Sequence, residues 1–343
     1  MHSFQSKKME IPLGAVWLMN SISEYKGKQE LYARQSPQML KALVEMALIE
    51  SAESSNRIEG VTVEPGRLRP LVIGHARPRD RDEEEVAGYR KAMALIHNKH
   101  QSLEIAPAVI KELHRLCRGE IADAGAWKQK DNELIRRNPD GTVDIIFKPV
   151  SAADTPKAME QLCRLYRHSL DQAKYPPLYA IACLVLDFLC IHPFRDGNGR
   201  VSRLLTLLAL YHHDFLVGKY ISLERIVEQG KETYYEALNR SSQTWHQARH
   251  DLSPWLHYFL GIILSAYKEF EQRAAFVKPA RGAKTEILEK SIERQSGEFT
   301  ITELTRMLPG ISRPMARVVL EAMRKKGLVK LVAKGRNARW RRI

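Results

Sequence analysis

Two strongly apolar runs enclose a polar, glycine-rich segment in this chain, and they restrict its fold more than any other feature. LYAIACLVLDFLC (178–190) precedes the segment and LLTLLALY (204–211) follows it. Such apolar runs are typical of helices buried in a domain core. Between them, His192–Arg203 contains a His, an Asp, two Gly, an Asn and three Arg. The sequence therefore predicts two core helices joined by a tight, charged loop.

Helical periodicity continues over most of the remaining chain. Apolar residues recur at spacings of three and four in MLKALVEMALIESA (39–52), VAGYRKAMALIHNK (86–99), APAVIKELHRLC (106–117) and PKAMEQLCRLYRHSL (156–170). The exception is NELIRRNPDGTVDIIFKPV (132–150), where two short β-like runs surround an Asn-Pro-Asp-Gly turn. We expect a mainly α-helical fold with one β-hairpin.

Composition limits the environment of the protein. With 343 residues and 44% apolar residues, the chain is long enough for two or three globular domains. Its four cysteines form no CxxC pair, which favours buried free thiols in a reducing compartment over zinc or disulfides. Glu10 and Pro12 interrupt any signal-like apolar core, and the run at 178–191 is too short for a bilayer and carries Asp187. These features predict a cytoplasmic protein without a membrane partner.

The last fifth of the chain forms a separate, basic region. After the break AAFVKPARGAKTE (274–286), residues 278–343 hold 17 Lys and Arg against 6 Asp and Glu, a net charge of +11. Three helical patterns follow (285–294, 301–308 and 313–326), and then LVKLV, a KGRN turn and ARWRR. This order predicts a winged helix-turn-helix. We therefore expect an N-terminal helical segment over 1–105, a core over 106–275 and the winged helix over 276–343.

The charged loop has the residues needed to hold a nucleotide. Gly197 and Gly199 permit unusual backbone conformations, and their N–H groups beside a helix N-terminus form a concave site for phosphate. Arg200 and Arg203, three apart on one helix face, can bracket further phosphate oxygens. Asp196 suits Mg²⁺, and His192 can accept a proton. The alternative is an ordinary turn with solvated arginines.

The segment His192–Arg203, HPFRDGNGRVSR, resembles the Fic family signature HPFx[DE]GNGRxxR at every specified position. The resemblance implies that ATP binds with Mg²⁺ and that AMP is transferred to a Ser, Thr or Tyr hydroxyl of a target protein. It assigns His192 as general base, Asp196 as the Mg²⁺ ligand and Phe194 as a core anchor. It also implies a phosphate cradle of Gly197, Asn198 and Gly199, with Arg200 and Arg203 at the outer phosphates.

Two other segments acquire roles from this resemblance. Fic proteins carry a β-hairpin flap that aligns a target segment by strand addition, which nominates Ile145, Ile146 and Phe147 as its edge. GKETYYEALNRSS (230–242) resembles the segment lining the adenine pocket, which nominates Tyr234, Tyr235 and Leu238. The alternatives are a capping hairpin without a partner and ordinary core aromatics.

An inhibitory segment is expected upstream. SNRIEG (55–60) resembles the Fic inhibitory motif [ST]xxxE[GN], which implies regulatory roles for Ser55, Glu59 and Gly60. A Glu59 carboxylate paired with Arg203 would remove the partner of the γ-phosphate and add negative charge beside it. An exposed glutamate near a helix end is the ordinary alternative. Whether Glu59 also supports removal of AMP from targets stays open.

Gly199 bears on the choice of reaction. The related Doc type has Lys at this position and binds ATP reversed, giving phosphorylation, so Gly199 favours AMP transfer. No GxxxxGK[ST] motif competes for phosphate chemistry.

The predicted winged helix has a basic face. Ser312 can cap a helix that exposes Arg313, Arg317 and Arg324 while Met315, Val318, Val319 and Met323 face inward. Basic residues of the expected wing, including Lys334 and Arg336, would add to a nucleic-acid surface. A protein-docking or dimer surface is the alternative.

Taken together, these features predict an autoinhibited protein adenylyltransferase that uses ATP and Mg²⁺, modifies a target protein or itself, and contacts DNA through its C-terminal domain. Two alternatives remain: a DNA-binding regulator whose Fic domain binds nucleotide without turnover, and an enzyme that removes AMP. A homodimer is left open.

Overall fold

The computed structural model describes residues 2–4, 11–35, 37–119, 122–137, 141–275, 283–293, 295, 297–308, 310–333, 335 and 338–343. The chain divides into two compact units. Unit 1 comprises 1–26 and 45–267, and unit 2 comprises 27–44 and 268–343. The division expected from the sequence, at 105/106 and 275/276, stays a prediction.

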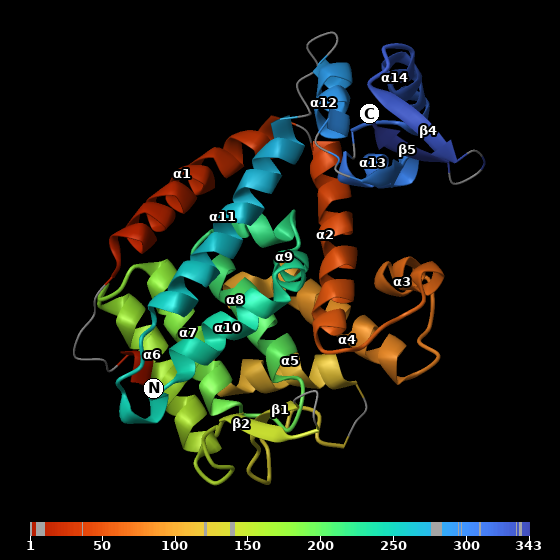
Figure 1. The fold of residues 1–343 in the computed structure, drawn as a ribbon. Coiled ribbons are helices and arrows are strands. Elements are labelled where there is room, and N and C mark those ends of the chain that lie inside the picture. The colour runs from red at the N-terminus through yellow and green to blue at the C-terminus, as the bar shows by residue number, and fades with distance from the viewer. Residues whose placement is uncertain are drawn as a thin grey trace. The chain divides into compact units, whose positions relative to one another are not determined.

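Unit 1 is helical apart from one hairpin, as the sequence predicted (Figure 1). The helices that lie wholly or partly in it are α1 (Leu13–Gln35), α2 (Pro37–Ile58), α3 (Pro65–Val72), α4 (Arg81–Lys99), α5 (Pro107–Arg118), α6 (Thr155–Asp171), α7 (Pro177–Ile191), α8 (Asn198–His212), α9 (Leu223–Gln229), α10 (Lys231–Ser242) and α11 (Ser253–Ala275). Short 3₁₀ turns occur at His2–Phe4, His100–Ser102, Leu216–Lys219 and Trp245–Gln247. The strands are β1 (Leu134–Arg137) and β2 (Val143–Phe147).

Helices α7 and α8 form the centre of this unit. Nearly every side chain of α7 and most of those of α8 are buried, and α4, α5 and α6 pack around the pair. Burial of an apolar side chain of this size stabilises a fold by about 1.5 to 3 kcal/mol. The two predicted core helices are therefore confirmed, and they hold the loop between them rigidly.

Backbone geometry makes the joint between α7 and α8 abrupt. His192 caps α7 at φ +51° while its N–H donates to the Phe188 carbonyl at 2.9 Å. Gly197 precedes α8 at φ +81°, a left-handed conformation that favours glycine. The chain thus leaves one core helix and enters the next within six residues, 192–197.

The hairpin pairs β1 and β2 antiparallel, with Ile135 opposite Ile145. Ile135, Val143 and Ile145 are 44–49% exposed. At the base of the hairpin, the Phe147 ring stacks on His246, with centroids 5.4 Å apart. The predicted turn at Asn138, Pro139 and Asp140 lies outside the described residues.

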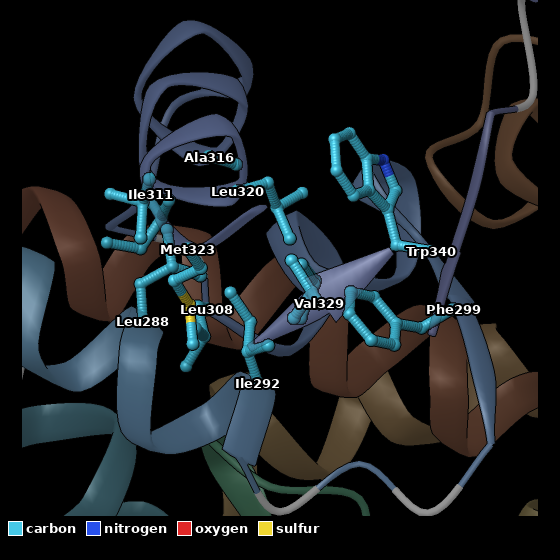
Figure 2. Packing of buried hydrophobic residues seen from close by; sticks show 12 residues of the cluster. Leu288, Ile292, Phe299, Leu308, Ile311, Ala316, Leu320, Met323, Val329 and Trp340 are labelled. Atoms are coloured by element: carbon cyan, nitrogen blue, oxygen red, sulfur yellow. The ribbon is translucent and has the colours of Figure 1, made fainter. Parts of the chain in front are cut away.

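Besides the parts of α1, α2 and α11 that belong to it, unit 2 contains further helices and a small antiparallel sheet of order β3-β5-β4. Its C-terminal elements are α12 (Ala283–Glu293), β3 (Glu298–Thr300), α13 (Ile301–Met307), α14 (Arg313–Lys325), β4 (Val329–Ala333) and β5 (Arg339–Arg342). Figure 2 shows its core, in which Leu288, Ile292, Leu320, Met323 and Trp340 converge from helices and sheet. The order of elements follows the prediction except for β3, whose three residues are too few to show a strand periodicity.

One predicted side-chain direction in α14 is wrong. Val318 was expected to face inward but is 69% exposed, whereas Val319 is 4% exposed. The buried stripe is Ala316, Val319, Leu320 and Met323, which follows the i, i+3, i+4, i+7 spacing of one helix face and leaves Val318 outside it. Ser312 caps the helix as expected, its Oγ accepting from the Met315 N–H at 3.3 Å.

All four cysteines are buried and unpaired, as predicted. Their burial raises the pKa of each thiol, to about 12 for Cys117 and Cys163. Within the described part of the chain, no helix is sufficiently long and apolar to cross a membrane.

Candidate active site

The upstream motif lies where helix α2 ends. Gly60, at φ +85°, follows the helix, and the Val61 N–H donates to the Asn56 carbonyl at 3.0 Å while the Gly60 N–H donates to that of Arg57 at 3.0 Å. This is the hydrogen-bond pair of a Schellman cap, in which the left-handed residue is usually glycine. Gly60 therefore ends the helix, and Glu59 lies directly after its last residue, Ile58.

Several contacts fix this end of α2 on the core of unit 1. Ser51 Oγ donates to the buried Glu224 carboxylate at 2.6 Å. Arg57 Nε lies 3.1 Å from Glu228 Oε1, and Lys231 Nζ donates to the Ile58 carbonyl at 2.7 Å. Helix α9 and the start of α10 thus set the position of Glu59.

Arg203 and Glu59, which the sequence analysis expected to pair, form an ion pair. Arg203 Nη2 lies 2.9 Å from Glu59 Oε1, and the same guanidinium donates at 2.9 Å from Nε to Ser55 Oγ and from Nη2 to the Ser55 carbonyl. Ser55 is fully buried and Arg203 is 8% exposed. Burial alone would lower the pKa of Arg203, but the Glu59 carboxylate together with Tyr234 and Tyr89 raises that pKa.

The Glu59 carboxylate also fills the space above Gly199. A Cβ at position 199 would overlap Glu59 Oε1 and would lie 3.2 Å from Arg203 Nη1. A carboxylate therefore occupies the glycine-lined space at the N-terminus of α8. This arrangement fits the anion cradle expected there, because the carboxylate oxygen stands where a phosphate oxygen would be favoured by the helix dipole.

Asp196 lies beside a buried group of charges. Asp196 Oδ1 accepts from the Gly197 N–H at 2.6 Å, and its Oδ2 lies 2.9 Å from Arg118 Nη1. Burial would raise the pKa of Asp196, but Arg118 and Arg200 hold it below its usual value. The side chain of Asp196 is 54% exposed, so its outer lone pairs remain open to a cation.

Arg200 is the predicted phosphate contact whose surroundings differ most from expectation. It is 1% exposed, and its Nη1 donates to Glu85 Oε2 and to Asn56 Oδ1. Glu85, 2% exposed, also accepts from Arg118 Nη1 at 2.7 Å. Arg81 Nε also lies 3.2 Å from Glu85 Oε1, so three arginines share one buried carboxylate from α4, and Arg200 supports the loop through it.

The loop is closed by its own asparagine. Asn198 Oδ1 accepts from the Phe194 N–H at 2.9 Å, and Asn198 Nδ2 donates to the Phe194 carbonyl at 2.8 Å. The Phe194 ring is fully buried and stacks on the His114 ring at 3.8 Å. Phe194 is thus the core anchor that the sequence predicted.

His114 fixes the loop from α5. The Gly125 N–H donates to its Nδ1 at 2.8 Å, so the proton is on Nε2, which donates to the Asp196 carbonyl at 3.0 Å. Burial lowers the pKa of His114 to about 4, which keeps the ring neutral at pH 7.

His192 has the tautomer that a general base needs. Its Nδ1 lies 3.3 Å from the Leu189 carbonyl, which can only accept, so the lone pair is on Nε2. Burial lowers the pKa of His192 to about 4, so the imidazole is neutral at pH 7. Lys128 Nζ donates to the neighbouring Ile191 carbonyl at 3.2 Å.

The aromatic candidates separate into two environments. Tyr234 is 4% exposed, and burial and the Glu59 carboxylate raise its pKa against the effect of Arg203. Tyr235 is 44% exposed, and Leu238 is half-buried. Tyr234 therefore adjoins the Glu59–Arg203 pair, while Tyr235 offers an open ring. On the hairpin, Ile145 is exposed, and Ile146 and Phe147 are half-buried.

Unit 2 presents a separate basic groove. Arg313 and Arg317 line a cavity of about 360 Å³ together with Thr300, Thr302, Pro314 and Val318. Arg313 Nη2 donates to Thr302 Oγ1 at 2.8 Å, and Arg324 lies 3.0 Å from Glu321 Oε2. Lys334 and Arg336 lie outside the described residues.

Sequence reasoning missed the residues that support the loop from other elements. Glu85, Arg118, His114, Asn56 and Lys128 lie 60 or more positions upstream of it. In the sequence, each resembles a solvated or ordinary helical residue. The packing of α4 and α5 against α8 brings Glu85, His114 and Arg118 to the loop, while Asn56 comes from α2 and Lys128 from the segment after α5.

The fold and the loop define a class of protein: a helical domain that holds a charged, glycine-containing turn between two core helices. Residues 104–210 match the sequence profile of the Fic/DOC family. Over these residues the chain is similar to the Fic/DOC family, and the match includes the loop between α7 and α8.

A curated relative agrees over part of its length. A Fido domain-containing protein of Dictyostelium discoideum is 33% identical over 94 residues, which cover 24% of this chain and 66% of that protein. The match thus spans just under two thirds of the relative's own length.

Solved structures share the fold. A Fic family protein from Desulfovibrio desulfuricans is 23% identical, covers 98% of this chain and 97% of its own, and gives a TM-score of 0.62. A Fic domain containing signaling protein from Bacteroides thetaiotaomicron gives 0.62 at 21% identity, over 76% of this chain and 99% of its own. Fic-1 from C. elegans gives 0.58 at 19% identity, over 76% and 73%. At these identities the likeness establishes a mainly helical Fic fold.

Proposed function

We propose that this protein is an autoinhibited protein adenylyltransferase, which transfers AMP from ATP to a hydroxyl side chain of a target protein. The observation that carries the proposal is the Glu59 carboxylate held over Gly199 by Arg203. A carboxylate already lies against Gly199, and the arginine that it pairs with is buried. A polyphosphate would take the same place and the same partner.

In this reaction His192 is the general base. Its neutral imidazole accepts the proton of the target hydroxyl at Nε2, and the hydroxyl oxygen forms a bond to the α-phosphorus. The bond from that phosphorus to the bridging oxygen breaks, and pyrophosphate leaves with the electron pair. Bound through Asp196, Mg²⁺ would neutralise phosphate charge.

The remaining candidate residues would bind the nucleotide or orient the target segment. The backbone N–H groups at Gly197, Asn198 and Gly199 would hold the inner phosphates, and Arg203 the outermost one. Arg200, which donates from Nη1 to Glu85 and Asn56, would keep the cradle rigid. Tyr234, Tyr235 and Leu238 would border the base, and Ile145, Ile146 and Phe147 would align the target segment along the hairpin edge.

Glu59 is the inhibitory residue in this proposal. While it is paired with Arg203, the outermost phosphate loses its cation and meets a like charge. Ser55 supports this inhibition because it accepts a hydrogen bond from the same guanidinium. Gly60 supports it because it ends helix α2 next to Glu59.

Intact-mass spectrometry tests the proposal. The Glu59→Gly protein, incubated with Mg²⁺ and ATP, should gain AMP adducts at least tenfold faster than the natural chain, whereas Glu64→Gly, an exposed control five residues on, should not. His192→Ala in the Glu59→Gly background should stop the reaction, because a general base contributes about 10²- to 10⁴-fold. A phosphate adduct in place of AMP, or equal labelling of all variants, would refute the proposal.

A second candidate is a DNA-binding regulator whose Fic domain binds nucleotide without turnover. The net charge of +11 over 278–343 and the groove lined by Arg313 and Arg317 favour it. A mobility shift of the full chain with duplex DNA, weakened steeply by salt, would support DNA contact. An absence of binding at low salt would remove this candidate.

A further inference from the structure

Arg118 is a buried cation in direct contact with the loop, although no motif in the sequence points to it. It lies in the last turn of α5 and is 5% exposed. Its Nη1 lies 2.9 Å from Asp196 Oδ2 and 2.7 Å from Glu85 Oε1. Its stem also supports the loop, since a Cβ at Gly197 would lie 3.3 Å from Arg118 Cδ.

Glu85 holds the Arg118 side chain beside Asp196. The carboxylate is 2% exposed, and it receives Arg118 on Oε1 and Arg200 on Oε2. A buried charge that loses its partner is strongly disfavoured, so each member of this group keeps the others in place. Arg118 is therefore a fixed positive charge at Asp196.

The surroundings of Asp196 oppose a bare dication. Arg118 contacts one carboxylate oxygen, Arg200 Nη2 lies 3.9 Å from the other, and Arg81 adds a more distant positive charge. No group of three or more His, Cys, Asp and Glu that could hold a metal ion occurs among the described residues. A free divalent cation would thus meet one carboxylate that is already neutralised.

We infer that Arg118 makes cation binding at Asp196 depend on a bound polyphosphate. Arg118 is a positioning residue: it orients the carboxylate and supplies a charge that only a polyanion can offset. The ligand class is a nucleoside polyphosphate carrying its divalent cation, in preference to either bare ion. This inference rests on the proposed function and adds the order in which that site accepts its ligands.

Calorimetric titration of ATP at a series of Mg²⁺ concentrations tests the inference. The background is Glu59→Gly, and the variants are Arg118→Gln, which keeps a donor for Glu85, Arg118→Met, which keeps the apolar stem, and Arg118→Lys, which keeps the charge. The Mg²⁺ concentration that half-saturates ATP binding should fall roughly tenfold in the Gln and Met variants, as expected for loss of one nearby positive charge. It should change less than about twofold in the Lys variant.

Arg115→Gln is the matched control, because Arg115 is exposed on the same helix and pairs with Glu112. An unchanged or higher Mg²⁺ requirement in the Gln and Met variants would overturn the inference, as would an equal fall in the Lys variant. If one neutral variant fails to fold, the other decides. Absence of ATP binding by the Glu59→Gly protein at every Mg²⁺ concentration would instead overturn the proposed function, and the inference with it.

Discussion

Two groups of arginines, one at the loop of unit 1 and one along the groove of unit 2, are held in opposite ways. In unit 1, Arg118, Arg200 and Arg203 are at most 8% exposed and each contacts a carboxylate. In unit 2, Arg313 and Arg317 are exposed along a groove. Buried charges must be paired, which fixes their geometry, whereas exposed charges act through a field that salt weakens. The first arrangement suits one ligand in one pose, and the second suits a polyanion without a fixed register.

The largest expected effect is the loss of stability when a buried carboxylate is removed, compared with removal of an exposed one. Glu85→Ala leaves Arg118 and Arg200 without their shared carboxylate, so the free energy of unfolding should fall by about 3 to 5 kcal/mol. Glu321→Ala removes the partner of exposed Arg324 in unit 2 and should change it by less than about 1 kcal/mol. Denaturant unfolding of the two variants measures both values. Similar losses of unfolding free energy in the two variants would show that the buried and the exposed carboxylate contribute equally.

Acid should weaken unit 1 through its buried histidines. His97, His114 and His192 each have a pKa lowered to about 4 by burial, so the unfolded chain binds their protons more readily than the folded one. Stability should therefore fall as the pH drops from about 6.5 through 4, by on the order of 3 kcal/mol for His114, which is 2% exposed. Unit 2 contains no histidine.

Unfolding of the natural chain and of His114→Gln at pH 7 and pH 5 measures this contribution. The Gln variant cannot titrate, so it should lose less stability between the two pH values. Parallel losses would show that His114 is not held neutral.

Adjacent valines in α14 provide a smaller, matched comparison within unit 2. Val319→Ala removes buried methyl groups and should cost roughly 2 kcal/mol, whereas Val318→Ala, at a position 69% exposed, should cost almost nothing. Thermal unfolding of both variants distinguishes them. A larger loss of stability for Val318→Ala would indicate that the Val318 side chain is buried, as the sequence predicted.

The smallest effect concerns the basic groove. If Arg317 contacts a DNA phosphate, Arg317→Ala should reduce the slope of log K against log salt by about 1 and weaken binding equally for all sequences. Arg324→Ala is the control, because Arg324 is already paired with Glu321. Equal effects of the two substitutions would indicate a diffuse field without a contact at the groove.

The loop at 192–203 could be predicted from the sequence, whereas the residues that support it could not, and the difference has a physical reason. The loop at 192–203 is contiguous, and Gly197, Asn198 and His192 each serve the backbone turn in which they stand, so a linear motif contains them. Its supports come from other elements: Glu85 and Arg118 become neighbours of Asp196 and Arg200 only when α4 and α5 pack on α8. Linear spacing has no information about such contacts.

Helix faces were predictable where the apolar stripe was unambiguous. Val319 and Met323 were assigned correctly, but Val318 was not, because an apolar side chain next to the stripe resembles a member of it. Strand β3 was missed because its three residues gain their conformation from pairing with β5. In both cases tertiary contacts, absent from local sequence, decide the outcome.

Nucleotide affinity tests whether the Glu59 carboxylate stands where the outermost phosphates of ATP would bind. Calorimetry should show that Glu59→Gln binds ATP with Mg²⁺ about tenfold more tightly than the natural chain, while the affinity for AMP, which lacks those phosphates, is unchanged. An equal gain for AMP, or no gain for ATP, would show that Glu59 does not compete with the outermost phosphates.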